Sequence, residues 1–115
     1  MEFDAYTVTM LRLRPDAPVM GEAEAGELQD RHLAHGAELQ DRGIILARGP
    51  FVDQDDPEFR GFSIWSVDQD TARAYAEADP AVQIGRLAVT VLTWMMPAGN
   101  LQFGKVRAPR SRAEV

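Results

Sequence analysis

The chain has 115 residues, of which 45% are hydrophobic, and this size fits one compact domain with a modest core. It contains no cysteine, which excludes disulfides, thiolate nucleophiles and cysteine-ligated metal sites. Its formal net charge of −6 argues against nucleic acid as the main partner, because phosphate binding needs a basic surface.

The first predicted element is a strand over residues 4–13, where β-branched and aromatic side chains precede Arg14-Pro15. Polar and apolar residues then recur at helical spacing over residues 22–42, and Gly43 is a suitable stop for this helix. Its inward stripe consists of Ala25, Leu28, His32, His35 and Leu39. Both histidines of the chain are therefore expected to point toward the sheet.

A hairpin is predicted next, with strands over residues 44–52 and 59–67 on either side of a polar turn. Asp68 is a plausible N-cap for a second helix, which should run through Ala78. An Asp-Pro pair, Asp79-Pro80, follows this helix directly, so the chain is expected to change direction there.

Asp79-Pro80 should end the second helix, since proline disfavours helical geometry in the residue before it. Pro80 can itself open a short helical turn, and the last strand is expected over residues 86–96. The order βαββαβ predicts an α+β, ferredoxin-like fold, with a four-stranded antiparallel sheet and both helices on one face.

The opposite face of the sheet is expected to be apolar as well. In the last strand, Leu92, Trp94 and Met96 alternate with another set of hydrophobic residues, so neither face of this strand is polar. Monomers seldom leave such a surface open, and packing of two sheets face to face would cover it. We therefore expect a homodimer.

The end of the chain differs in composition from the rest. Residues 104–115 carry four basic residues against one acidic residue, which leaves about −9 on the remainder. We assign residues 1–98 to the domain and residues 99–115 to a C-terminal tail that is flexible or docks on the dimer partner. No apolar run approaches the length that crosses a membrane, so we expect a cytoplasmic protein.

Several segments together resemble the YCII-related family of the dimeric αβ-barrel superfamily, over roughly residues 4–97. The segments are His32-Leu33 with Leu39 and Gly43, the strand end Ala47-Arg-Gly-Pro50, Gly61, and Ala76-Glu-Ala-Asp-Pro80 with Gly85. The resemblance implies a dimeric αβ barrel and a His/Asp active site at His32 and Asp79. It also implies that a chemistry such as dehydrochlorination of a hydroxylated chloroaromatic occurs in one branch.

The chemistry of these two residue types suits such a site. Imidazole takes up and returns a proton near neutral pH, and a carboxylate on its other nitrogen fixes the tautomer and stabilises the imidazolium. Structural roles remain open for both residues: His32 could be a satisfied core histidine, and Asp79 could be the N-cap of the turn that follows.

Other side chains are candidates for binding a substrate. Arg48 could hold an anion, and His35 lies one helical turn from His32. Aromatic residues that could line a pocket are Tyr6, Phe51 and Trp65. We expect no metal and no cofactor, because a histidine pair needs a third ligand and no nucleotide-binding motif is present.

Three functions are compatible with the sequence. The first is a cofactor-free lyase or isomerase that acts on a small organic molecule, possibly aromatic or chlorinated, through the His/Asp pair. The second is a monooxygenase or haem-binding protein of the same superfamily. The third is a non-enzymatic dimeric module that binds a metabolite or a partner, with the histidines serving only to pack the core.

Overall fold

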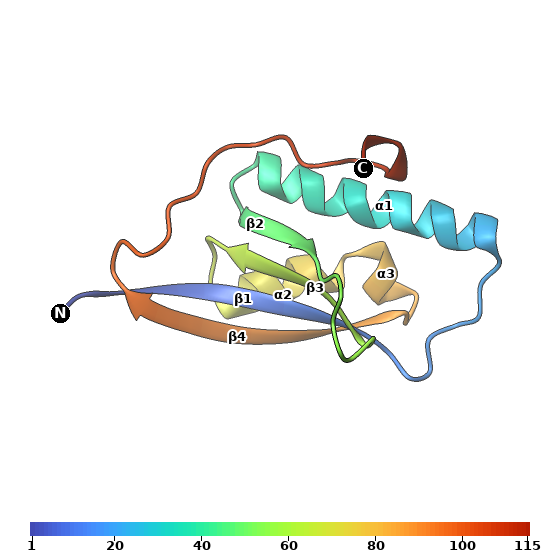
Figure 1. The fold of residues 1–115 in the computed structure, drawn as a ribbon, viewed down its shortest axis with the longest axis horizontal. Coiled ribbons are helices and arrows are strands. Elements are labelled where there is room, and N and C mark those ends of the chain that lie inside the picture. The colour runs from blue at the N-terminus through green and yellow to red at the C-terminus, as the bar shows by residue number, and fades with distance from the viewer.

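A computed structural model describes residues 1–115 and contains a single four-stranded antiparallel sheet. Its strands are β1 (Phe3–Leu13), β2 (Ile45–Pro50), β3 (Phe59–Trp65) and β4 (Leu87–Pro97). The strand order is β2-β3-β1-β4, so the first strand is central and the last one forms an edge (Figure 1).

The helices are α1 (Glu22–Asp41), α2 (Gln69–Glu77) and the short α3 (Pro80–Gln83), with a 3-10 turn, η1, at Arg112–Glu114. Leu39 of α1 and Ala72 of α2 pack in one cluster with Trp65 of β3, so both helices cover the same face of the sheet. The predicted ferredoxin-like βαββαβ arrangement is therefore confirmed.

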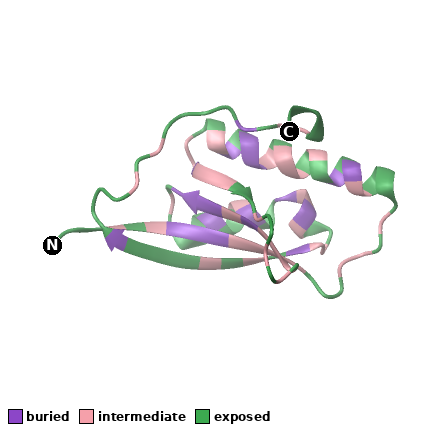
Figure 2. Cartoon of the chain, in the orientation of Figure 1, coloured by how far each residue is buried: buried purple, intermediate pink, exposed green.

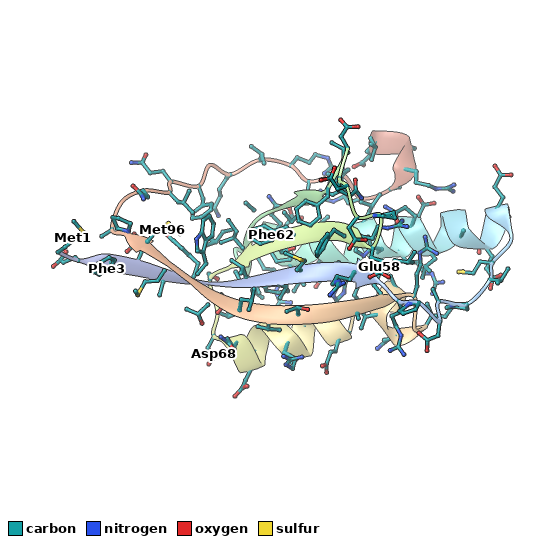
Figure 3. The ribbon with its side chains drawn as sticks, turned by 60° about the horizontal axis from the view of Figure 1, so that its bottom comes forward. Met1, Phe3, Glu58, Phe62, Asp68 and Met96 are labelled. Atoms are coloured by element: carbon teal, nitrogen blue, oxygen red, sulfur yellow. The ribbon has the colours of Figure 1, made fainter.

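Local sequence signals explain where the helices begin and end. The side chain of Asp68 accepts a hydrogen bond from the backbone N–H of Thr71 at 2.8 Å and caps α2, at the position labelled in Figure 3. Gly43 follows α1 with φ of +73°, a conformation that residues with a Cβ atom rarely adopt. The predicted cap and stop are thus both present.

The strand bounds differ from the predicted ones at the hairpin. β2 ends at Pro50 instead of residue 52, because the chain turns at Asp53, whose φ is +58°. β3 ends at Trp65 instead of residue 67, where the Ser66 hydroxyl donates to the carbonyl of Gly43 at 2.7 Å. None of the helices is both long and apolar enough to span a lipid bilayer.

Two hydrophobic clusters hold α1 against the rest of the domain. The larger one joins α1, β2, β3 and α2 and contains Leu39, Ile45, Trp65, Ala72 and Ala76. The smaller one joins α1, α3 and β4 through Leu28, Ala81 and Leu87. Between Leu28 and Leu39, the same stripe of α1 carries the two histidines, so the packing of both clusters positions them.

No helix covers the second face of the sheet. Phe62 and Trp94 lie on it with their ring centroids 6.4 Å apart, and Figure 3 labels Phe62 and Met96 there. Figure 2 shows much of β4 in the colour of exposed residues. Leu92 is 49% exposed and Trp94 is 43% exposed. The expected apolar second face is therefore present.

The C-terminal tail, expected from its composition to be flexible or to dock on a partner, makes contacts with its own chain. It leaves β4, passes the edge of β2 and lies along α1 of its own chain (Figure 1). Ala108 is only 5% exposed, and the guanidinium of Arg112 pairs with Asp30 at 3.0 Å while Arg110 pairs with Asp41. The basic residues of the tail match acidic residues on the outer surface of α1, a match between segments that composition alone does not reveal.

The docking of the tail should depend on pH. Hydrogen bonds from the Arg112 side chain lower the pKa of Asp30, and the backbone N–H of Arg110 and the side chain of Arg107 lower the pKa of Glu114. A carboxyl group whose pKa is lowered by docking stabilises the docked state at pH values above its ordinary pKa. This stabilisation is lost as the pH falls through the lowered pKa. The tail should therefore be ordered at neutral pH and loosen below about pH 4.

Backbone 15N relaxation of residues 108–114, followed from pH 7 downward, measures this loosening, with the Trp65 indole signal reporting whether the core stays folded. Asp30→Asn should make the tail mobile already at neutral pH. A tail that remains equally rigid at pH 3 in a folded protein would show that these ion pairs do not hold it.

Candidate functional site

Asp79 occupies the joint between α2 and α3 and is 5% exposed. Its backbone is extended, and Pro80 occupies the first position of α3, which needs no N–H donor. One carboxylate oxygen, Oδ1, accepts a hydrogen bond from the N–H of Ala81 at 2.9 Å. Asp79 is thus the N-cap of α3, as the structural interpretation of the sequence proposed, and its second oxygen remains available.

That second oxygen meets His32. Nδ1 of His32 lies 2.6 Å from Oδ2 of Asp79, and the two side chains are 13% and 8% exposed. Because a carboxylate only accepts hydrogen bonds, Nδ1 carries the proton in this contact. The other ring nitrogen, Nε2, is then the free base of a neutral imidazole.

Arg48 on β2 approaches this free nitrogen. Its Nη2 atom lies 3.4 Å from Nε2 of His32, and its Nη1 atom donates to the carbonyl of Leu33 at 3.5 Å. Burial lowers the pKa of the guanidinium, and the charge of Asp79 partly opposes that effect. An arginine still remains protonated at neutral pH, so Arg48 places a fixed positive charge beside His32.

Gly36 makes the position of Arg48 possible. A Cβ atom at this residue would lie 1.9 Å from Nη1 of Arg48, which no real contact allows. The guanidinium therefore rests directly on the backbone of α1, one turn beyond His32. This close approach is a reason for a glycine in the interior of a helix, where glycine costs about 1 kcal/mol relative to alanine.

His32 and Arg48 both line a cavity of about 470 Å³, a size typical of sites for small molecules. Its floor comes from β1 and β3 at Leu11, Gly61 and Ser63, and Leu33 of α1 forms part of the wall. Asp79 does not line the cavity, so it stands behind the imidazole and not beside a bound molecule.

The other predicted binding residues are divided between this cavity and distant positions. Phe51 lines the cavity. Tyr6 lies on the opposite face of the sheet, where its ring packs edge-on against Phe103 at a centroid distance of 5.5 Å. Successive residues of a strand point to opposite faces of the sheet. Tyr6 of β1 therefore points away from the cavity, whereas Leu11 of the same strand lines it.

His35 of α1 and Trp65 of β3 have other partners. Nε2 of His35 donates to the backbone carbonyl of Tyr75 at 2.9 Å, which ties α1 to α2. The indole N–H of Trp65 donates to Oγ1 of Thr9 at 2.8 Å within the larger cluster. Neither residue lines the cavity, so the structure gives both of them packing roles.

Several lining residues were not singled out from the sequence. They are Gln29, Gln54, Arg60, Ser63, Arg86 and the tail residues Val106, Arg107, Ala108 and Pro109. Arg60 and Arg86 lie at the starts of the strands predicted over residues 59–67 and 86–96, and an exposed arginine is the default expectation at a strand end. The tail carried no structural signal beyond its charge, and its place in the wall follows from its docking on α1.

This arrangement places an imidazole and a fixed cation at the wall of one cavity, with a carboxylate behind the imidazole. Such a set can remove a proton from a bound molecule and stabilise the negative charge that develops. No group of three or more histidine, aspartate or glutamate side chains lies close enough together to hold a metal ion.

The comparisons with known proteins concern the fold and the family. No curated protein matches the sequence. Among solved structures, the chain is similar to 5-chloro-2-hydroxyhydroquinone dehydrochlorinase (TftG) from Burkholderia phenoliruptrix AC1100, in complex with 2,5-dihydroxybenzoquinone. The TM-score is 0.47 at 22% identity, and the match covers 77% of this chain and 90% of that chain. The model of the YCII-related domain matches residues 8–95, which is most of the chain and includes both His32 and Asp79. The protein therefore belongs to the YCII-related domain family.

Proposed function

We propose that the protein is a small-molecule enzyme in which His32 is the general base and Asp79 orients it. The observation that carries this proposal is the 2.6 Å contact between the two side chains at the wall of a cavity that Asp79 itself does not reach. Asp79 then fixes the tautomer, and the nitrogen beside the cavity is the one free to accept a proton.

The proposed reaction begins with removal of a proton from a carbon next to a carbonyl group of the substrate, which includes the keto tautomer of a phenol. The proton goes to Nε2 of His32, and the electron pair of the broken C–H bond moves into the adjacent group as an enolate. Arg48 stabilises the negative oxygen. Return of the proton to another carbon completes an isomerisation, whereas expulsion of a leaving group with the electron pair completes an elimination.

We infer in addition that the working unit is a homodimer. The apolar face opposite the helices includes Leu92, Trp94 and Phe62, and charged residues are few along this part of β4. A second copy presents the same surface, so packing of the two sheets across a two-fold axis would remove both faces from water together.

Loss of the base should abolish proton transfer. The assay is 1H NMR of solvent deuterium exchange into a panel of small 2-oxo acids and hydroxylated aromatic acids. For a molecule that the wild type labels, His32→Gln should reduce the exchange rate by about 10²-fold or more. Asp79→Asn keeps the cap of α3, since an amide oxygen also accepts from Ala81, but should slow exchange by removing the orienting charge.

His35→Gln is the matched control, because glutamine can still donate to the Tyr75 carbonyl and His35 lies outside the cavity. It should exchange at the wild-type rate. Equal rates in the wild type and His32→Gln would contradict the role of His32 as base.

The dimer makes a separate prediction. Light scattering at micromolar concentration should give the mass of two chains, and Leu92→Glu should shift the protein to a folded monomer, because it places a charge in the interface. Ala74→Glu, on the exposed side of α2, should leave the dimer intact. A wild-type chain that is monomeric and fully folded would contradict the dimer.

A further inference from the structure

The cavity beside His32 has an unusual charge for this protein. Its lining residues include four arginines and no aspartate or glutamate, although the chain as a whole has a formal net charge of −6. The four are Arg48, Arg60, Arg86 and Arg107. A concave surface lined by charges of one sign concentrates ligands of the opposite sign.

Arg48 has no carboxylate partner within ion-pair distance. Its guanidinium contacts only the carbonyl of Leu33 and the ring of His32, both at the long end of hydrogen bonding. The charge of Asp79 acts on it from behind the imidazole. A largely buried cation without a direct counter-ion is costly, and a bound anion would relieve that cost.

Arg86 is likewise free of side-chain ion pairs, while Arg60 uses only its Nε atom, which donates to the carbonyl of Pro57 at 2.7 Å. Both guanidinium groups therefore keep donors for a ligand. Their fork geometry matches a carboxylate, to which arginine donates two parallel hydrogen bonds.

Arg107 comes from the tail, outside the part of the chain that matches the family domain. It forms one hydrogen bond with Glu114 at 2.8 Å and is otherwise available. Its position follows from the docking of the tail, in which Ala108 is buried and Arg112 lies over Gly26, where a Cβ atom would lie 2.2 Å from the guanidinium. The tail thus adds a fourth cation to one side of the cavity.

The remaining wall favours an organic body over a bare ion. The apolar lining residues include Leu11, Leu33, Phe51, Leu87 and Val106. Apolar walls with a few convergent charged groups are typical of sites for small organic ligands.

We propose that this cavity binds a small organic carboxylate, with the carboxylate held by the arginine cluster and Arg107 of the tail acting as a specificity-determining residue. This inference rests on the proposed function, since it names the substrate class of the same site. It adds that a segment beyond the family domain selects the substrate.

Isothermal titration with benzoate, phthalate and benzamide tests the proposal in the full-length protein. Phthalate, with two carboxylates, should bind more tightly than benzoate, and benzamide, a neutral analogue of benzoate, at least tenfold more weakly. The affinity for benzoate should fall when the salt concentration is raised. Arg107→Gln should weaken benzoate binding at least fivefold, and Arg86→Gln should have an effect of similar size.

Arg73→Gln is the matched control, because it removes the same charge from the outside of α2, away from the cavity. It should leave benzoate binding unchanged. The proposal is overturned if benzamide binds as well as benzoate, if none of the three compounds binds at 10 mM or below (about 3 kcal/mol of affinity), or if inorganic phosphate binds more tightly than phthalate. If Arg107→Gln and Arg73→Gln weakened benzoate binding equally, the tail would have no specific role in the site.

His32→Gln separates this inference from the proposed catalysis. It should abolish solvent exchange while retaining benzoate binding, because the arginines remain in place. If the wild type bound benzoate but catalysed no solvent exchange, the enzyme proposal would be overturned and the carboxylate site would stand. If it catalysed exchange but did not discriminate between benzoate and benzamide, the carboxylate site would be overturned and the enzyme proposal would stand.

Discussion

One buried carboxylate connects the fold of this protein to its candidate site. Asp79 uses one oxygen to cap α3 and the other to hold His32 of α1, so a single side chain ties two helical segments together. A buried carboxylate is costly unless each oxygen finds donors, and here both do. The same constraint that stops α2 at Pro80 also sets the direction of the imidazole. The orientation of the imidazole therefore follows from the way that the second helix ends.

Arg48 completes the arrangement from the other side of the ring. Its guanidinium rests on Gly36 and faces Nε2 of His32, so the imidazole lies between a carboxylate and a fixed cation. The two charges act on different nitrogens and thereby define different roles for them. Nδ1 is committed to Asp79, and Nε2 is the atom beside the cavity. The chain is net acidic, yet four arginines and no acidic residue line this cavity, while most of the acidic residues are exposed on the helices and loops.

Much of this could be predicted from local signals. The His stripe of α1, the stop at Gly43 and the Asp-Pro joint are encoded within a few residues each, and they place His32 and Asp79 on facing segments. The cavity wall was harder to predict, because it depends on which face of a strand each residue occupies and on strand order. Tyr6 was assigned to the cavity but lies on the opposite face, since aromatic character gives no information about strand parity. The docking of the tail depends on matching its arginines to acids such as Asp30 and Asp41, about 70 to 80 positions away in sequence, and no local pattern encodes that match.

The two histidines allow a direct measurement of the central claim. His32 should be protonated at Nδ1, which donates to Asp79, and His35 at Nε2, which donates to the Tyr75 carbonyl, so the two rings should have opposite tautomers. Two-bond 1H–15N NMR spectra of the imidazole rings at neutral pH distinguish these forms, with His35 as the internal reference. We expect an unprotonated Nε2 in His32 and loss of the fixed tautomer in Asp79→Asn. An Nε2-protonated His32 in the wild type, or a tautomer unchanged by Asp79→Asn, would contradict the claim that Asp79 prepares His32 as a base.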